Sequence, residues 1–333
     1  MNWIIENVFS DSYTWGTLEL KVLLNNNRLP ALVLFGLLSL TNTASAIIVG
    51  GTSANNGIYA ASGYTGVGFS VASVGSCSGS LLSTGMHFLT AAHCILGATG
   101  NATINFSNGT SSFSYTSVSM IAHPDFSSSS YFGGADLAIV TLGQIVDASI
   151  SRYSLYSATG ELGQTGTIVG YGREGIGTSG GDSGTFGTRR QGQNQIDELI
   201  GGNILYYDFD NGLAAQSSSG GLGLGVYEVG IYRGDSGGPT FIGNQIAGIH
   251  SFISCTPPTS GTNACGAADV DGALNGTFGE RFGDTRVSAY VTWINSVTSV
   301  NSAVETAVPE PSTYATGLIA LLFLAVKARK TRN

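Results

Sequence analysis

Charged side chains are scarce in this chain. Asp, Glu, Lys and Arg make up 10% of its 333 residues, against about 25% in an ordinary soluble domain. The charge that is present is one-sided, with a formal net charge of -8, and the one marked basic cluster lies at 327–332. A surface of this sign repels phosphate groups. The composition therefore argues against a nucleic-acid partner and against attraction to an anionic membrane surface.

Cysteine is also sparse, with four residues in the whole chain and no Cys-x-x-Cys spacing of the kind found in many metal sites. Cys77 lies near Cys94 and Cys255 lies near Cys265, so two local disulfides are the simplest of the three ways to pair them. Four free thiols or a metal site are the alternative. Two disulfides would indicate an oxidising compartment.

Glycine, by contrast, is abundant, with 49 residues interleaved with Val, Ile, Leu, Ser and Thr and without a collagen-like period. This pattern predicts an all-β fold of short strands joined by tight turns. Runs that alternate apolar and small polar residues predict strands at 66–74, 80–90, 136–142, 165–171 and 245–252. A spacing of three and four predicts a single late helix through Val287, Tyr290, Val291, Ile294 and Val297.

A long Gly/Ser-rich stretch at 172–225 is expected to consist mainly of loops. It contains Asp208 and Asp210, a pair that could suggest calcium. The segment lacks the later ligands and the bidentate Glu of a known calcium loop, so we expect a solvated turn there.

Residues 1–46 are expected to be an N-terminal extension and signal peptide. Lys21 and Arg28 precede an apolar run, Leu29–Leu40, and the small residues Ala44-Ser45-Ala46 follow it, as before a signal peptidase cut. The sequence therefore predicts export, with the folded region beginning after Ala46.

Residues 301–333 are expected to form a linker and a separate tail. The tail contains Val308-Pro309-Glu310-Pro311, an apolar run at 315–326 and four basic residues. The apolar run is shorter than the about 20 residues of a usual membrane-spanning helix. We expect a short transmembrane segment, with a disordered tail as the alternative.

Three blocks carry residues suited to peptide hydrolysis, which needs a nucleophile, a base, a carboxylate that holds the base, and donors for the oxyanion. The block Leu89–Cys94 places His93 just after a predicted strand, and Asp136 stands at the head of an apolar strand. The block Gly234–Pro239 sets Ser236 among glycines, where backbone amides can turn toward one point.

These blocks, in the order His, Asp, Ser, resemble the trypsin/chymotrypsin family of serine proteases. Further blocks agree with the resemblance, at Ile48–Gly51, His123–Phe126 and Arg286–Ile294. The resemblance covers about 48–297. It implies a protease domain at residues 47–300 made of two six-stranded antiparallel β-barrels, at about 48–150 and 160–297, closed by a C-terminal α-helix.

The same resemblance implies roles for individual residues. His93, Asp136 and Ser236 would be the catalytic triad, and the amides of Gly234 and Ser236 would form the oxyanion hole. Ser251 would support Asp136. This chemistry requires no cofactor and no metal, and its substrate would be a protein or peptide.

Activation and specificity are expected to depend on a second set of positions. A free amine at Ile48 would pair with Asp235. A cysteine common in the family is replaced by Tyr232, which favours a Cys255–Cys265 bridge within one loop. Gly230 at the floor of the specificity pocket carries no charge, and Ile253 stands where a pocket-wall glycine is common. Trypsin-like specificity for basic residues is therefore not expected.

A second Gly-Asp-Ser-Gly, at 181–184, lacks the following Gly-Pro, so Ser183 is expected to be a turn residue. A catalytically silent binding module or a surface-structural protein on this fold is the alternative function, and the intact triad argues against both.

The C-terminal tail resembles a PEP-CTERM sorting signal, known from Gram-negative bacteria whose exosortases process such proteins. The resemblance rests on Val308-Pro309-Glu310-Pro311, the apolar run and the basic end. It implies transient anchoring in the inner membrane and then release to the cell surface.

Overall fold

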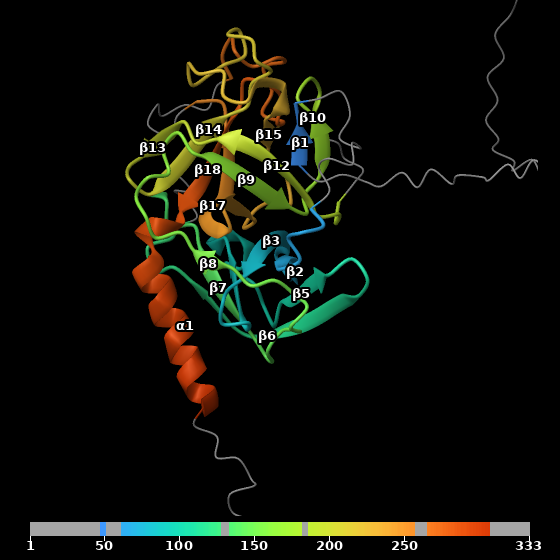
Figure 1. The fold of residues 1–333 in the computed structure, drawn as a ribbon, viewed down its shortest axis with the longest axis vertical. Coiled ribbons are helices and arrows are strands. Elements are labelled where there is room, and N and C mark those ends of the chain that lie inside the picture. Colours follow the sequence, from blue (N-terminus) through green and yellow to red (C-terminus); the bar gives the residue numbers. More distant parts are fainter. Residues whose placement is uncertain (1–46, 51–60, 128–132, 182–185, 257–264, 307–333) are drawn as a thin grey trace, which may run out of the picture. The chain divides into compact units, whose positions relative to one another are not determined.

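The folded part of the chain is mostly β-structure (Figure 1). The computed structural model describes residues 47–50, 61–127, 133–181, 186–256 and 265–306. All of them belong to one unit, residues 42–333. The predicted signal peptide, Ser183 and the C-terminal tail lie outside the described residues. Within those residues, no helix is both long and apolar enough to cross a membrane.

Six strands form a closed barrel in the order β2-β3-β4-β7-β6-β5, with every neighbouring pair antiparallel. They are β2 (Val67–Ala72), β3 (Gly75–Leu81), β4 (His87–Thr90), β5 (Thr103–Ser107), β6 (Ser112–Ala122) and β7 (Ala138–Leu142). Its interior is filled by large apolar side chains such as Phe88 and Phe106. The first predicted barrel is confirmed. The strand predicted at 80–90 is wrong as one element, because the chain reverses near Gly85, whose φ of 75° suits glycine.

The second half of the domain is built on an eight-stranded sheet. Its strands are β8 (Ser154–Leu155), β9 (Thr165–Gly170), β12 (Arg190–Gln195), β13 (Glu198–Ile200), β14 (Ile204–Asp208), β16 (Pro239–Ile242), β17 (Gln245–Ser254) and β18 (Arg281–Arg286). Six run as antiparallel neighbours in the order β12-β9-β16-β17-β18-β14. The end strands are joined by the Asn194 side chain of β12, which donates to the Asp208 carbonyl of β14 at 2.6 Å. A closed second barrel would require β12 and β14 to pair along their backbones. The structure has this side-chain hydrogen bond between them instead.

The start of the predicted domain is a buried strand. A small sheet has the order β11-β10-β1-β15, with β11 at Gly180–Gly181, β10 at Glu174–Ile176, β1 at Ile47–Val49 and β15 at Val229–Gly230. In it β1 runs parallel to β10 and antiparallel to β15, and Ile48 lies opposite Gly230. All three residues of β1 are fully buried. They pack with Val229 and Phe282 in one hydrophobic cluster, so β1 belongs to the core.

Five strands that the sequence did not predict, β10 to β14, lie in the stretch 172–225, although most of its described residues are outside strands, as expected. Strand β12 was missed because its sequence is almost entirely polar. Its Asn194 is nevertheless buried, because its amide has carbonyl partners. The solvated turn expected at Asp208 and Asp210 is also wrong, because these side chains are only 2% and 0% exposed.

The predicted late helix is confirmed with different ends. A 3-10 turn, η6 (Val287–Ala289), precedes α1 (Val291–Thr306), so the helix continues past the expected linker start at residue 301. Arg286 makes two 2.8 Å contacts with the buried carboxylate of Glu161, and the Ser288 hydroxyl donates to the same group. This paired charge fixes the start of the helix to the second sheet.

Candidate active site

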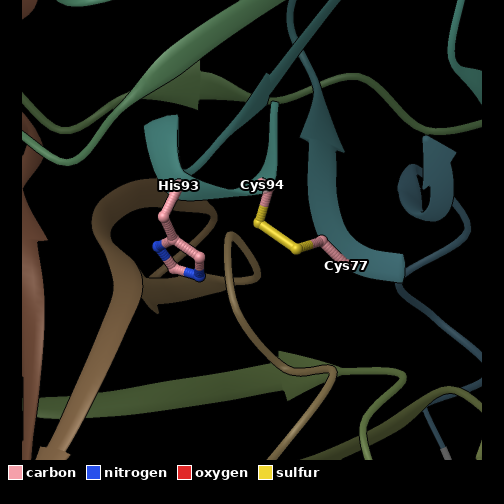
Figure 2. A group of neighbouring side chains, drawn as sticks. All are labelled: Cys77, His93 and Cys94. Carbon is pink, nitrogen blue, oxygen red and sulfur yellow. A yellow bond between two sulfur atoms is a disulfide. The ribbon is translucent and has the colours of Figure 1, made fainter. Parts of the chain in front are cut away.

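His93 lies in a short 3-10 helix, η2 (Ala92–Cys94), directly after β4. Cys94 of this helix forms a disulfide with Cys77 of β3, which confirms the predicted pairing. Figure 2 shows the His93 ring and the disulfide extending from neighbouring positions of the helix. The bridge therefore fixes the helix to the barrel wall. The His93 side chain keeps 20% of its surface exposed, so it remains accessible to a molecule outside the protein.

Asp136 lies two residues before β7 and is fully buried. Because Thr90 of β4 pairs with Ala138 of β7, the residues after β4 and before β7 meet at one end of the barrel. Asp136 Oδ2 lies 2.6 Å from His93 Nδ1, and Oδ1 accepts the His93 backbone N–H at 2.9 Å. An ionised carboxylate can only accept, so Nδ1 carries the proton and Nε2 becomes the basic nitrogen.

The second half of the domain also holds Asp136. The register of β17 against β18 shifts between His250 and Phe252, which makes Ser251 the residue at a β-bulge. Bulges redirect side chains. The Ser251 hydroxyl donates to Asp136 Oδ2 at 2.6 Å, the contact that the resemblance implies. Thr285 of β18 donates to the Asp136 carbonyl at 3.0 Å.

Ser236 lies in the turn between β15 and β16, and Ser78 of β3 holds this turn. The Ser78 amide donates to the Ser236 carbonyl at 2.8 Å, and the Ser78 hydroxyl donates to the Gly234 carbonyl at 2.8 Å. A side chain at Gly237 would collide with Thr90 at the end of β4. The Ser236 turn is therefore packed against the end of the barrel that carries His93.

Two backbone amides of this turn have no acceptor among the residues that the structure describes. The amides of Asp235 and Gly237 donate to carbonyls inside the protein. Within the part of the chain that the structure describes, the amides of Gly234 and Ser236 make no such bond. Gly234 has a φ of 98°, and a side chain there would collide with Phe186. The turn thus requires glycine at 234, and its two amides can bind an external oxygen atom.

Asp235 is fully buried beside this turn. Its oxygens accept the amides of Gly172 and Tyr232 at 2.8 and 2.9 Å. Burial raises its pKa to about 6, although these hydrogen bonds and the nearby His250 and Arg190 act in the opposite direction. In the uncut chain the nitrogen of Ile48 is a backbone amide in β1, so its ion pair with Asp235 stays a prediction.

The position expected to be the pocket floor is occupied by an aromatic ring. A side chain at Gly230 would collide with the ring of Phe282, which is fully buried. Ile253 lies opposite Phe282 in the pairing of β17 with β18. The sequence did not indicate a role for Phe282, because the residue spacing in β18 does not show which side chain contacts Gly230 of β15.

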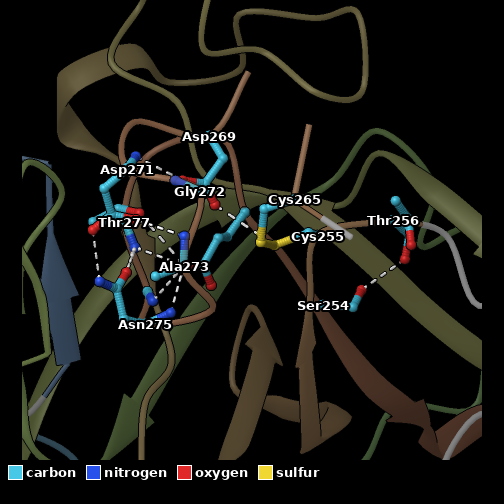
Figure 3. The surroundings of a disulfide bond; sticks show 12 residues. Ser254, Cys255, Thr256, Cys265, Asp269, Asp271, Gly272, Ala273, Asn275 and Thr277 are labelled. Atoms are coloured by element: carbon cyan, nitrogen blue, oxygen red, sulfur yellow. Dashed lines mark hydrogen bonds between the residues drawn. A yellow bond between two sulfur atoms is a disulfide. The ribbon is translucent and has the colours of Figure 1, made fainter. Parts of the chain in front are cut away.

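The second disulfide joins Cys255 to Cys265, as predicted. It follows β17 directly. Figure 3 shows it beside a loop that is held by Asp269, whose Oδ1 accepts the amides of Asp271 and Gly272 at 2.8 and 2.7 Å. With both bridges formed, no cysteine is free, and the alternative of free thiols or a metal site is excluded.

The family model described as trypsin matches residues 48–270, which is well over half of the chain. The chain belongs to the trypsin family. Among solved structures, this trypsin-family chain is similar to neuropsin, a serine protease expressed in the limbic system of mouse brain. The match has 16% identity and a TM-score of 0.52, and it covers 71% of this chain and 96% of neuropsin. At this identity the likeness shows the fold alone, which is chymotrypsin-like. No curated protein matches the chain.

Two buried groups next to the candidate site were missed in the sequence. One is Ser78, a small polar residue that is not distinguishable from its neighbours in β3. The other is a second His–Asp pair in which His250 Nδ1 lies 3.0 Å from Asp284 Oδ1, with both side chains fully buried. Tyr207 donates to the same Asp284 oxygen at 3.2 Å. The contact between His250 and Asp284 could not be predicted, because it depends on the pairing of β17 with β18.

The Ser251 hydroxyl supports a test of the site geometry. Ser251→Ala removes one of the donors to the ionised Asp136, and such a bond contributes about 1.5–3 kcal/mol. We expect kcat for peptide hydrolysis to fall roughly tenfold or more with little change in KM. Steady-state kinetics measures this. The control is Ser254→Ala, because Ser254 lies in the same strand and bonds to Tyr206 instead. Equal kcat values for the two variants would contradict the assignment.

Proposed function

We propose that this chain is an exported serine endopeptidase that hydrolyses peptide bonds through an acyl-enzyme on Ser236. The observation that carries the proposal is the hydrogen bonding of His93 to the buried Asp136, at the barrel end against which the Ser236 turn packs. Membership of the trypsin family supports it, since serine proteases of this family use the same three residue types in the same order.

In the proposed reaction His93 first acts as a base. The Ser236 oxygen attacks the carbonyl carbon of the substrate, and its proton passes to His93 Nε2. The proton then goes to the leaving amine as the carbon–nitrogen bond breaks. Water attacks the resulting ester in a second round with the same proton transfers, which releases the acid and restores Ser236.

The protein's fixed groups lower the barriers of both steps. Asp136 orients the His93 ring and stabilises the positive charge that forms on it. The amides of Gly234 and Ser236 donate to the oxygen that becomes negative in the tetrahedral intermediate. Removing one oxyanion-hole donor, a side-chain amide in subtilisin, costs about 2.7–4 kcal/mol.

The proposed specificity is for small or medium apolar residues before the cut bond. Phe282 packs over Gly230, and Ile253 lies opposite it, so the space for a long side chain is reduced. Glu228 is the nearest acid in sequence. Its two oxygens accept the amides of Leu224 and Asp210, and the side chain is fully buried, so it is not placed to attract a basic substrate residue.

The proposed activation requires a cut before Ile48. A free amine there would pair with Asp235, whose burial without an ammonium partner is costly. In the uncut chain Ile47 has a φ of 76°. For a β-branched residue this conformation costs about 1–2 kcal/mol, and a cut after Ile47 would remove that cost.

Export and surface delivery are also proposed. They rest on the Ala44-Ser45-Ala46 signature after an apolar run, on the two disulfides, and on the tail with Val308-Pro309-Glu310-Pro311. Signal peptidase would cut the first segment. An exosortase of a Gram-negative bacterium would process the tail after transient anchoring in the inner membrane.

The test of the function itself uses three variants. Ser236→Ala and His93→Ala should each lower peptide hydrolysis by on the order of 10⁴-fold or more, because each removes a member of the proton-transfer pair. Ser183→Ala, in the second Gly-Asp-Ser-Gly, is the control and should keep wild-type turnover. A serine-directed fluorophosphonate should label only proteins that retain Ser236. Absence of labelling in the wild type would instead favour the silent binding module or the surface-structural protein.

Cleavage preference is tested with a peptide library. We expect products that end in small or medium apolar residues, because the Phe282 ring limits the depth of the pocket. The products are identified by mass spectrometry. A profile dominated by Arg or Lys would contradict the role given to Phe282 and Gly230.

Activity should fall reversibly at alkaline pH. Pairing with Asp235 raises the pKa of the Ile48 amine, so the stabilisation is fully present below the unfolded value of roughly 7.7–8.0 and is lost as pH rises through the folded value. A pH–rate profile measures the fall. N-terminal sequencing of active enzyme should give Ile48 first, and full activity with Ile47 still attached would show that the ion pair is not needed.

A further inference from the structure

Three buried carboxylates lie close together at one end of the second sheet, and none of them belongs to the proposed triad. They belong to Asp208 at the end of β14, to Asp210 just after it, and to Glu228 just before β15. One oxygen from each lies within 4.8 Å of the other two. Asp208 is 2% exposed, and Asp210 and Glu228 are 0% exposed.

Among the described residues, no Arg, Lys or His forms an ion pair with any of these three carboxylates. Arg281 lies opposite Asp208 in the sheet, but its Nε donates to Ser218 and one terminal nitrogen lies 3.9 Å from Glu198.

One oxygen of the cluster has no hydrogen-bond partner in the described part of the chain. Asp210 Oδ1 accepts the Gly212 amide, whereas Asp210 Oδ2 is buried and has no donor among the described residues. A buried carboxylate oxygen without a donor costs free energy that a protein rarely leaves uncompensated. It therefore points to a ligand of positive charge at this place.

Backbone amides of the segment between Asp210 and Glu228 donate hydrogen bonds to the carboxylates. The amides of Ser218 and Ser219 donate to Asp208 Oδ2 at 2.7 and 2.8 Å. The Leu224 amide, just before the 3-10 turn η4 (Gly225–Tyr227), donates to Glu228 Oε1 at 2.9 Å. The segment 209–227 is thus a loop whose shape depends on these three acids.

We propose that Asp208, Asp210 and Glu228 bind one calcium ion. The candidate ligands are all oxygens of carboxylates, which are hard ligands, and no His or Cys belongs to the cluster. They come from an irregular loop, and Ca²⁺ accepts such flexible geometry, with main-chain carbonyls and water completing its shell. Mg²⁺ demands a near-ideal octahedron and gives up its water reluctantly.

The ion would bind next to β15, the strand that precedes the Ser236 turn. Glu228 immediately precedes Val229 and Gly230 of β15, and its carbonyl accepts the Gly50 amide just after β1. Calcium bound to Glu228 would therefore fix the loop 209–227 to the strand that leads to Ser236. This role goes beyond the proposed peptide hydrolysis and does not depend on it.

The loop of Figure 3 supplies a matched control. Asp271 also lies in an acidic, glycine-containing loop, but its side chain is exposed, and its oxygens accept the Ala273 amide and the Asn275 side chain. Because its oxygens are already satisfied and exposed to water, Asp271→Asn should leave calcium binding unchanged.

The experiment uses the full chain with Ser236→Ala, which prevents self-digestion. After removal of metal with a chelator, calorimetric titration with CaCl₂ should show one ion per chain. Asp210→Asn should weaken the affinity by roughly 10- to 100-fold or more, since it removes a ligand charge. No binding up to about 10 mM calcium, tenfold above the weakest Kd of known extracellular modules, would overturn the proposal, as would equal affinity in Asp210→Asn.

Thermal unfolding separates loss of the ion from loss of the fold. Calcium at about 100 times its Kd should raise Tm by roughly 5–10 °C in the parent protein. Without calcium, Asp210→Asn should melt higher than the parent, because it removes a repelling buried charge, and calcium should then raise its Tm little. If Asp210→Asn melts lower and keeps the full calcium-dependent rise, the cluster is not the site.

Discussion

The Asp136 carboxylate is the group on which the rest of the site depends. It is fully buried, and a buried charge is tolerated only when hydrogen bonds satisfy it. Its donors come from both halves of the domain: the backbone and ring of His93 in the first barrel, and the hydroxyl of Ser251 in the second sheet. The two halves must therefore meet correctly for this charge to be stable, and the same meeting orients the His93 ring. The contacts that stabilise the buried Asp136 carboxylate are thus the same contacts that set the geometry of the site.

Much of this could be predicted from the sequence because the relevant signals are local. His93, Asp136 and Ser236 each lie in a short block of distinct composition, and the cysteine pairs are neighbours in the chain. In the first barrel, the runs at 66–74 and 136–142 mark β2 and β7, whereas β5 and β6 were not predicted. What could not be predicted depends on contacts between distant segments. Ser78 and Phe282 have their roles only because β3 meets the Ser236 turn and β18 meets β15.

The strands and buried acids within 172–225 were missed for a different physical reason. The glycine, serine and charged residues of this stretch are typical of solvated loops, and hydrophobic periodicity is the main signal for strands. Here buried polar groups are satisfied by the backbone: Asn194 donates to two carbonyls, and Asp208 accepts two amides. A composition that looks exposed is therefore compatible with burial, and no local pattern separates the two cases.

The position of β1 bears on the order in which the chain folds. The strands of the closed barrel lie within residues 67–142, so that barrel can form as soon as this part of the chain is available. By contrast, β1 precedes the barrel strands in the chain, yet its partners β10 and β15 begin only at residues 174 and 229. Contacts between such distant segments form late, because closing long loops has an entropic cost. During synthesis β1 therefore lacks its partner strands, and a chaperone that shields its Ile and Val side chains until β15 has emerged would reduce aggregation.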